Sequence, residues 1–330
     1  MNDSDEKFRI ERRDVLKLGA AATVGFLARD LVAGEPKALP PLPDNHITSG
    51  AMPTRNLGRT GYRVGIFSLG GQASVEKPDN FDVAVPIVER ALDLGVNYVD
   101  TSARYGGEKR WSEQYVGRVM KHRRNEAFLA TKTHDRTREG SLRLLEKSLQ
   151  LLQTDHIDLW QIHNLSRPEE IDRIFAPDGA VKALIEAREQ KIVRFIGVTG
   201  HADPGVLLSA IRRFPFDTVL MAVNAADPHH LSFQEELLPL AVEKEMGIIG
   251  MKIPARGRIL GALSMPEAMR YTLSLPVSTV IIGCDSIAQL EENVRIAKGF
   301  TPLSQPQLAA LTAKAEPVKK EALFFRRWET

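Results

Sequence analysis

Charged side chains stand at the ends of several apolar segments that have the length of β-strands. Examples are Asp100, Lys132, His163, His201 and Lys252, each directly after or at the end of an apolar run. Singly, such residues have ordinary roles, because an Asp often caps a helix and a Lys usually keeps its charge in solvent. Together they predict a site for acid–base chemistry, because an apolar strand that ends in Lys or His otherwise buries a costly charge.

Metal binding is another use of histidine, for which His163, His201, His229 and His230 are the candidates. No spacing of His or carboxylate residues completes a set of metal ligands. The single cysteine, Cys284, excludes intramolecular disulfides, a cysteine-based zinc site and a cysteine-ligated iron–sulfur cluster. We therefore expect neither a metal site nor an iron–sulfur cluster.

The segments that must position these residues alternate between strand-like and helix-like patterns. Continuously apolar strands that alternate with helices predict an α/β protein with a parallel sheet. Eight such units in about 250 residues predict a closed (β/α)8 TIM barrel. A doubly wound open sheet would need G-x-G-x-x-G after its first strand, where this chain has Gly70-Gly71-Gln72-Ala73. The eight expected strands begin near Val64, Val96, Ala127, Ile157, Phe195, Thr218, Gly247 and Thr279.

Two further elements are expected outside the eight units. Residues 52–57 and 62–66 flank Gly58-Arg59-Thr60-Gly61, which predicts an N-terminal β-hairpin that closes the bottom of the barrel. The segment after residue 300 alternates prolines with short helical stretches and ends in an aromatic run. We therefore expect residues 301–330 to form a helical tail packed on a barrel of residues 51–300.

Residues 1–34 have the pattern of a bacterial export signal. Arg12-Arg13 precedes an uncharged stretch over 18–28, which is shorter than the roughly 20 residues needed to span a membrane. The pattern resembles a twin-arginine (Tat) signal peptide, which implies the twin-arginine translocase as a partner and a periplasmic or exported location. An N-terminal helix with a basic start and an uncleaved membrane anchor remain alternatives. The proline-rich residues 35–50 are expected to form a linker.

Composition and charge exclude several classes of protein. Apolar residues make up 43% of the chain and charged residues 26%, an ordinary globular composition that excludes wholesale disorder and a coiled coil. The 44 Lys and Arg residues nearly balance the 42 Asp and Glu residues, and no basic stripe is present. We therefore expect no nucleic-acid partner.

Several motifs resemble those of the aldo-keto reductase family. The segment Tyr98–Gly106, YVDTSARYG, places an Asp five residues before a Tyr at the end of the second expected strand. Further matches in chain order are RNLGRTG (55–61), SEQYVG (112–117), ATK (130–132), QIHN (161–164) and LEEN (290–293). The resemblance covers roughly residues 52–300 and implies a divergent bacterial member of the family.

The resemblance implies four catalytic residues, Asp100, Tyr105, Lys132 and His163. In the family a hydride passes between a nicotinamide and a carbonyl carbon, so the carbonyl oxygen needs a proton, which Tyr105 would supply. Lys132, held by Asp100, is expected to lower the pKa of the Tyr105 phenol, and His163 to orient the carbonyl. The implied activity is reduction of an aldehyde, ketone or sugar with NADP(H) or NAD(H), or oxidation of the matching alcohol.

Two other functions remain open from the sequence. A regulatory or sensor protein could keep the barrel and the dinucleotide with little turnover, although the four matching catalytic residues argue against it. Another barrel chemistry, such as that of a lyase or an isomerase, is the second alternative.

The expected contacts to the nicotinamide depart from the family pattern. The family has Ser-Asn after the fifth strand, where this chain has Thr199-Gly200, so a neighbouring histidine is the substitute for the Asn side chain. The sixth strand offers an Asn instead of a Gln, and a Lys replaces an aromatic ring after the seventh. A segment with glycine and two arginines follows and suits a pyrophosphate. The residues expected to contact this half of the cofactor are Thr199, His201, Asn224, Lys252, Arg256 and Arg258.

The loop after the eighth strand predicts how the adenosine half is held. Aligning LEEN (290–293) with the family motif puts Gln289 and Gly283 where the family often has Arg and Lys for the 2′-phosphate of NADPH. Asp285 adds a negative charge, so we expect weak discrimination between NADPH and NADH. The residues expected to contact this half are Gly283, Cys284, Asp285, Ser286, Gln289, Glu292 and Asn293.

Overall fold

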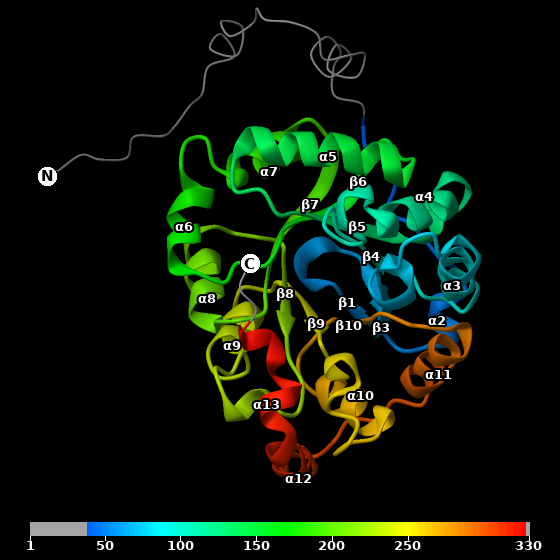
Figure 1. Cartoon of the computed structure of the whole chain (residues 1–330), viewed down its shortest axis with the longest axis vertical. Coiled ribbons are helices and arrows are strands. Elements are labelled where there is room, and N and C mark those ends of the chain that lie inside the picture. Colours follow the sequence, from blue (N-terminus) through cyan, green and yellow to red (C-terminus); the bar gives the residue numbers. More distant parts are fainter. Residues whose placement is uncertain (1–37, 328–330) are drawn as a thin grey trace, which may run out of the picture. The chain divides into compact units, whose positions relative to one another are not determined.

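A computed structural model describes residues 38–327 of the chain, and the predicted export signal of residues 1–34 lies outside this range. Its main strands are β3 (Phe67–Gly70), β4 (Tyr98–Asp100), β5 (Phe128–Thr133), β6 (Ile157–Ile162), β7 (Val193–Gly200), β8 (Thr218–Ala222), β9 (Gly247–Met251) and β10 (Thr279–Ile282). They form a closed parallel barrel in the order β10-β3-β4-β5-β6-β7-β8-β9, surrounded by helices (Figure 1). The predicted (β/α)8 fold is confirmed.

Amphipathic helices connect the strands and cover the outside of the barrel. The longer ones bury a stripe of apolar side chains, as in the helix over 81–93, where Ile87, Val88 and Leu92 are fully buried. Within the described residues, none is long and apolar enough to cross a membrane. The helices are α2 (Thr48–Ala51), α3 (Phe81–Asp93), α4 (Trp111–Arg123), α5 (Arg138–Leu152), α6 (Pro168–Phe175), α7 (Ala180–Glu189), α8 (Pro204–Arg213), α9 (Leu237–Glu243), α10 (Met265–Leu273), α11 (Ile287–Lys298), α12 (Gln305–Ala315) and α13 (Lys319–Ala322).

An antiparallel hairpin of β1 (Thr54–Asn56) and β2 (Arg63–Gly65) precedes the barrel, as predicted. Tyr62, at the start of its second arm, stacks on Phe128 of β5 with ring centroids 4.6 Å apart. Phe128 in turn stacks on Tyr98 of the neighbouring β4 and on Phe195 of β7, two strands away. This aromatic stack fills the N-terminal end of the barrel.

The first barrel strand begins later than the sequence predicts. The apolar run from Val64 to Leu69 is divided between two sheets, because residues 63–65 pair with β1 and only residues from Phe67 onward pair with β10 and β4. Both parts of the run are buried, so hydrophobicity alone does not mark the change of partner.

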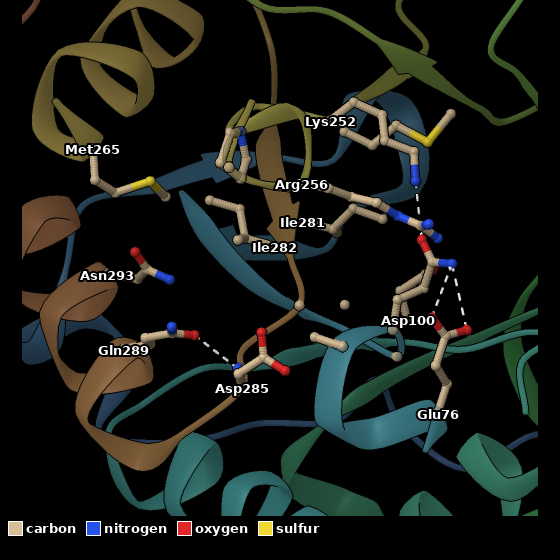
Figure 2. Close-up of a pocket in the computed structure, with 18 of the residues that line it drawn as sticks. Glu76, Asp100, Lys252, Arg256, Met265, Ile281, Ile282, Asp285, Gln289 and Asn293 are labelled. Atoms are coloured by element: carbon tan, nitrogen blue, oxygen red, sulfur yellow. Dashed lines mark hydrogen bonds between the residues drawn. The ribbon is translucent and has the colours of Figure 1, made fainter. Parts of the chain in front are cut away.

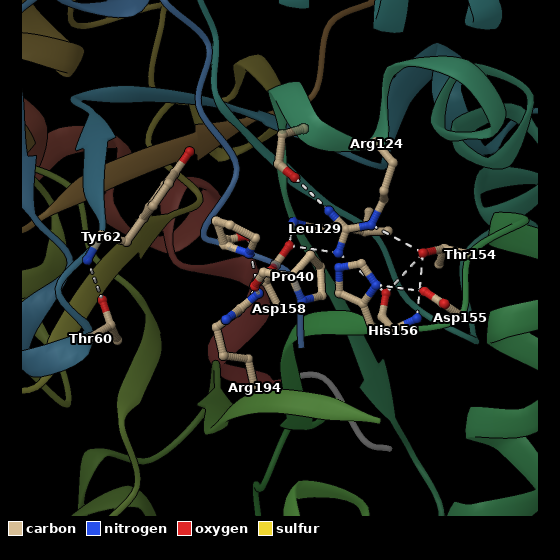
Figure 3. A network of polar contacts seen from close by, with 12 residues as sticks. Pro40, Thr60, Tyr62, Arg124, Leu129, Thr154, Asp155, His156, Asp158 and Arg194 are labelled. Atoms are coloured by element: carbon tan, nitrogen blue, oxygen red, sulfur yellow. Dashed lines mark hydrogen bonds and ion pairs between the residues drawn. The ribbon is translucent and has the colours of Figure 1, made fainter. Parts of the chain in front are cut away.

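Residues 38–50, part of the predicted linker, instead pack against the barrel. At the N-terminal ends of β6 and β7, Arg194 donates a hydrogen bond from Nη2 to the Pro40 carbonyl oxygen, 2.7 Å away (Figure 3). The same guanidinium lies 3.3 Å from Asp158 Oδ1, and Arg124 holds the other oxygen of Asp158 at 2.7 Å (Figure 3). A buried carboxylate with two guanidinium partners therefore ties this segment to the strands.

The C-terminal helices α12 and α13, red in Figure 1, continue to a short 3-10 turn over Phe324–Arg327. There Arg326 forms a fully buried ion pair with Asp227, which follows β8. Arg326 Nη1 also donates to the carbonyl oxygen of His201 at 2.7 Å, and Thr312 of α12 accepts a hydrogen bond from His229. These contacts place the end of the tail against the β7 and β8 loops.

Candidate active site

The structure brings the four predicted catalytic side chains together at the C-terminal ends of β4, β5 and β6. Asp100 ends β4, Lys132 lies near the end of β5, and His163 follows β6 directly. Lys132 forms an ion pair with Asp100 and donates to the Thr101 carbonyl oxygen at 2.7 Å. The Lys132 ammonium lies 4.9 Å from the centre of the Tyr105 ring. Because parallel strands point their carboxyl ends the same way, residues far apart in sequence meet here.

The Tyr105 phenol is protonated at neutral pH. Burial raises its pKa well above the ordinary value, and the negative charge of Asp100 raises it further. Lys132 was expected from the sequence to lower this pKa, but in the structure the pKa is raised. The negative charges of Asp100 and Glu76 raise this pKa, and Lys132 is paired with Asp100.

His163 lies beside Tyr105, with ring centroids 5.7 Å apart and the rings nearly perpendicular. Burial lowers its pKa well below the ordinary value, and the charges of Lys132 and Arg136 lower it further, so the imidazole is neutral. Its Nδ1 lies 3.2 Å from Ser102 Oγ. Nε2 is therefore the nitrogen left for a substrate.

A cavity of about 630 Å³, here called the dinucleotide cavity, extends from Asp100 and Tyr105 to the first turns of α11. Figure 2 shows Lys252, Arg256, Asp100 and Glu76 on one side, with Asn293, Gln289 and Asp285 on the other. Ile281 and Ile282 of β10 form part of the wall between them. The predicted cofactor contacts that line it are Lys252, Arg256, Gly283, Asp285, Gln289, Glu292 and Asn293.

A second cavity of about 440 Å³ adjoins the first and is lined by two more of the predicted site residues. Tyr105 and Lys252 line both cavities, while His163 and His201 line the second. His201 Nδ1 lies 2.6 Å from Asn164 Oδ1, which fixes the orientation of both side chains. Tyr105 therefore stands where the two cavities meet.

Two predicted nicotinamide contacts, Thr199 and Asn224, line neither cavity. Thr199 Oγ1 accepts a hydrogen bond from the Asn164 amide at 2.7 Å. Asn224 donates to the Lys252 carbonyl oxygen at 3.0 Å and accepts from the Ala226 amide at 2.9 Å. Both side chains thus organise the loops that carry other site residues.

Arg258, Cys284 and Ser286 also line neither cavity. The Arg258 guanidinium stacks 4.0 Å from the ring centre of Phe324 in the C-terminal tail. Cys284 lies in the loop after β10, and its side chain is fully buried. Ser286 caps α11 by accepting a hydrogen bond from the Gln289 amide at 3.2 Å.

A polar bridge that was not predicted from the sequence joins residues shared by the two cavities. Lys252 Nζ donates to Gln72 Oε1 at 2.9 Å, and Gln72 Nε2 lies 3.4 Å from the carboxylate of Glu76 (Figure 2). Burial raises the pKa of Glu76. Lys252 has a left-handed backbone with φ of 62°, which is strained for a non-glycine residue. The sequence signal that could have indicated this bridge is that Gln72 follows the Gly70-Gly71 pair at the end of a strand.

Lys252 is expected to make dinucleotide binding depend on protons. Burial and the charge of Arg256 lower the pKa of Lys252 to about 7, so part of the population is neutral at pH slightly above 7. A phosphate-bearing ligand nearby favours the ammonium form and raises that pKa, so binding should take up protons. Titration calorimetry in two buffers of different ionisation enthalpy measures this uptake, and Lys252→Met should abolish it. Identical buffer dependence in the wild type and the variant would contradict the assignment.

The model of the Aldo/keto reductase family matches residues 63–264, which is more than half of the chain. The chain belongs to this family. Within it, L-galactose dehydrogenase of Arabidopsis thaliana is 28% identical over 312 residues, covering 80% of this chain and 95% of that protein. An aldo-keto reductase of Bacillus halodurans is 25% identical, with a TM-score of 0.68 over 80% of this chain and 96% of that one. A thermostable aldo-keto reductase solved with the inhibitor epalrestat is 26% identical, with a TM-score of 0.66 over 80% of this chain and 100% of that one.

Aldo-keto reductases use NADP(H) or NAD(H), so this chain is an NAD(P)-dependent oxidoreductase. The dinucleotide cavity fits such a cofactor. It is elongated and joins Tyr105 to α11, and Arg256 can bind phosphate at one wall. A side chain at Gly283 would place its Cβ 2.9 Å from the Gln72 carbonyl oxygen, so the loop can follow the cavity this closely only as glycine.

Proposed function

We propose that this protein transfers a hydride between a bound nicotinamide dinucleotide and a small carbonyl or alcohol substrate, with Tyr105 as the proton donor for reduction. The observation that carries the proposal is that Tyr105 lines both cavities, with His163 and Lys132 beside it. A substrate in the second cavity would meet the phenol at the boundary with the cofactor. An aldehyde, a ketone or a sugar suits this arrangement.

The dinucleotide, when bound, supplies or accepts the hydride. Tyr105 holds its proton at neutral pH and gives it to the carbonyl oxygen as negative charge develops there. His163, neutral and oriented through Ser102, places Nε2 for a hydrogen bond to the same oxygen. Lys132 and Asp100 form a buried pair that fixes the position of the ammonium behind the phenol ring.

Turnover of a panel of aldehydes, ketones and sugars with NADPH and with NADH tests the proposal through the absorbance of the reduced nicotinamide. We expect reduction of at least one class. Dinucleotide binding without turnover across the whole panel would refute the proposal and leave the regulatory alternative.

Replacing Gln289 with Arg is expected to shift cofactor preference toward NADPH by about tenfold or more, because a charge-assisted hydrogen bond contributes about 1.5–3 kcal/mol. Gln289 lines the dinucleotide cavity in the first turn of α11, and its Oε1 accepts from the Asp285 amide at 2.8 Å. Competitive titration with NADH and NADPH measures the preference. Gln305→Arg, on the exposed start of α12, is the matched control. An unchanged ratio in Gln289→Arg would place the 2′-phosphate elsewhere.

We also propose that the protein is exported by the twin-arginine route with its dinucleotide already bound, since this route carries folded proteins. The support is the Arg12-Arg13 pair followed by a short uncharged stretch. Replacing both arginines with lysine should keep the protein in the cytoplasm, as measured by cell fractionation. Wild-type protein found in the cytoplasm with residues 1–34 intact would contradict the proposal.

A further inference from the structure

The second cavity is positively charged on the side away from the dinucleotide. Arg104, Arg136 and Arg167 line it from three successive loops, those that follow β4, β5 and β6. None of the three lines the dinucleotide cavity. Among the described residues that line only the second cavity, Glu170 is the single carboxylate, so guanidinium charge is in excess.

Arg136 is held in place as a ligand-binding residue would be. Its Nε donates to Glu170 Oε1 at 2.8 Å, and its Nη2 donates to the Asn164 carbonyl oxygen at 3.1 Å. Glu170 is fixed in turn by the backbone amides of Ser166 and Arg167, at 2.8 and 3.0 Å. One nitrogen of the guanidinium, Nη1, is buried with no hydrogen-bond partner. A buried donor without a partner is costly, and Arg136 lines the cavity, so an anion that reached Nη1 there would satisfy it.

The excess charge also acts on the neighbouring histidines. Burial lowers the pKa of His134, and the charges of Arg104, Arg110 and Arg136 lower it further. His134 lines the same cavity, and its Nδ1 is likewise buried without a partner. Arg104 is exposed, and its guanidinium makes no ion pair within the described residues. Of the three arginines, Arg136 pairs with Glu170 and Arg167 lies 3.7 Å from Glu169. The wall opposite the dinucleotide therefore presents the charge of Arg104 and the unpartnered Nη1 of Arg136 within the described residues.

We propose that the substrate carries an anionic oxygen group, a carboxylate or a phosphate, and that Arg136 binds this group with Arg104 and Arg167 at the rim. This inference rests on the proposed function, because it places the carbonyl end of the same substrate at Tyr105. A guanidinium binds a carboxylate or phosphate through paired N–H donors, which fixes orientation as well as position. The anionic group thus points the carbonyl toward the phenol.

Matched substrates with and without the anionic group test the proposal. Succinic semialdehyde against butanal examines a carboxylate, and glyceraldehyde 3-phosphate against glyceraldehyde examines a phosphate. In at least one pair we expect kcat/KM for the anionic member to exceed that of the neutral member at least tenfold. The pair that shows the larger ratio identifies the anion. Ratios near one in both pairs would overturn the proposal.

Three variants locate the effect. Arg136→Gln and Arg104→Gln should each lower the anionic-to-neutral ratio of kcat/KM, mainly through KM of the anionic substrate. Arg136→Lys should restore part of the ratio, because it returns the charge without the paired donors. Arg104 is exposed, so its variant tests the proposal even if Arg136→Gln fails to fold. Arg143→Gln is the matched control, because in the described part of the chain that exposed arginine pairs only with Glu139 on α5. An anionic-to-neutral ratio of kcat/KM that equals the wild-type ratio in all four variants would overturn the assignment.

Direct binding separates this inference from the proposed function. Succinate and inorganic phosphate, titrated into the dinucleotide complex by calorimetry, should give saturable heat for at least one anion. Arg136→Gln should lose that heat. Saturable binding without turnover of any carbonyl would refute the proposed function and support the anion site. Turnover of a carbonyl without saturable anion binding and without a preference for anionic substrates would support the proposed function and refute the anion site.

Discussion

Replacing Tyr105 with Phe is expected to lower kcat by about 10²–10⁴-fold, the usual contribution of a positioned general acid. The substitution removes the hydroxyl and its proton but keeps the ring. The contacts of that ring with Lys132 and His163, at 4.9 and 5.7 Å, are therefore retained. Dinucleotide affinity should stay close to that of the wild type, because the cavity keeps its shape.

Steady-state turnover and fluorescence titration with NADPH and NADH separate these two effects. Tyr115→Phe is the control, because the Tyr115 hydroxyl bonds to the Lys77 carbonyl oxygen at 2.6 Å and lines neither cavity. A Tyr105→Phe variant that kept more than about a tenth of wild-type kcat would show that another group gives the proton.

Replacing Arg326 with Met is expected to lower the free energy of unfolding by about 3–5 kcal/mol, because it leaves a buried charge without its partner. Asp227 is fully buried and depends on Arg326 for its counter-charge. The same change removes the hydrogen bond from Arg326 to the His201 carbonyl oxygen. The tail would then lose its anchor beside the second cavity.

Urea denaturation measures this loss, with Arg327→Met as the control, since the exposed Arg327 bonds to the Lys320 carbonyl oxygen and to no other group among residues 38–327. Burial raises the pKa of Asp227, and removing Arg326 raises it further. The folded protein then binds more protons than the unfolded chain at acidic pH, so the destabilisation should shrink as pH falls. A loss equal to that of the control at every pH would show that the pair contributes no net stability.

The fold could be predicted from the sequence because its signals are local. Eight apolar runs separated by helical patterns leave few arrangements other than a closed barrel. Strand starts at Ile157, Thr218, Gly247 and Thr279 agree with the structure, since each follows a polar or turn-forming stretch. The start near Val64 was wrong, because one buried run serves two sheets and only the pairing partner distinguishes them.

The candidate catalytic residues were also readable from the chain. Asp100, Lys132 and His163 each end an apolar strand, and the parallel barrel brings such ends to one face. Their protonation was not readable. The pKa of Tyr105 depends on how deeply it is buried and on the pairing of Lys132 with Asp100, which only the packed structure establishes.

Tertiary structure alone decided which polar groups remain for a ligand. Thr199 and Asn224 have suitable side chains, yet backbone groups on neighbouring loops use them. The opposite holds for the arginines of the second cavity, which lie in three separate loops and show no common pattern in the sequence. Asp227 and Arg326 likewise meet across 99 residues of chain. The sequence by itself determined the strands, their order and the chemistry at their ends, because hydrophobic pattern and residue type are local. Only the folded barrel decided which of those groups are already satisfied, because hydrogen bonds and ion pairs are made between distant segments.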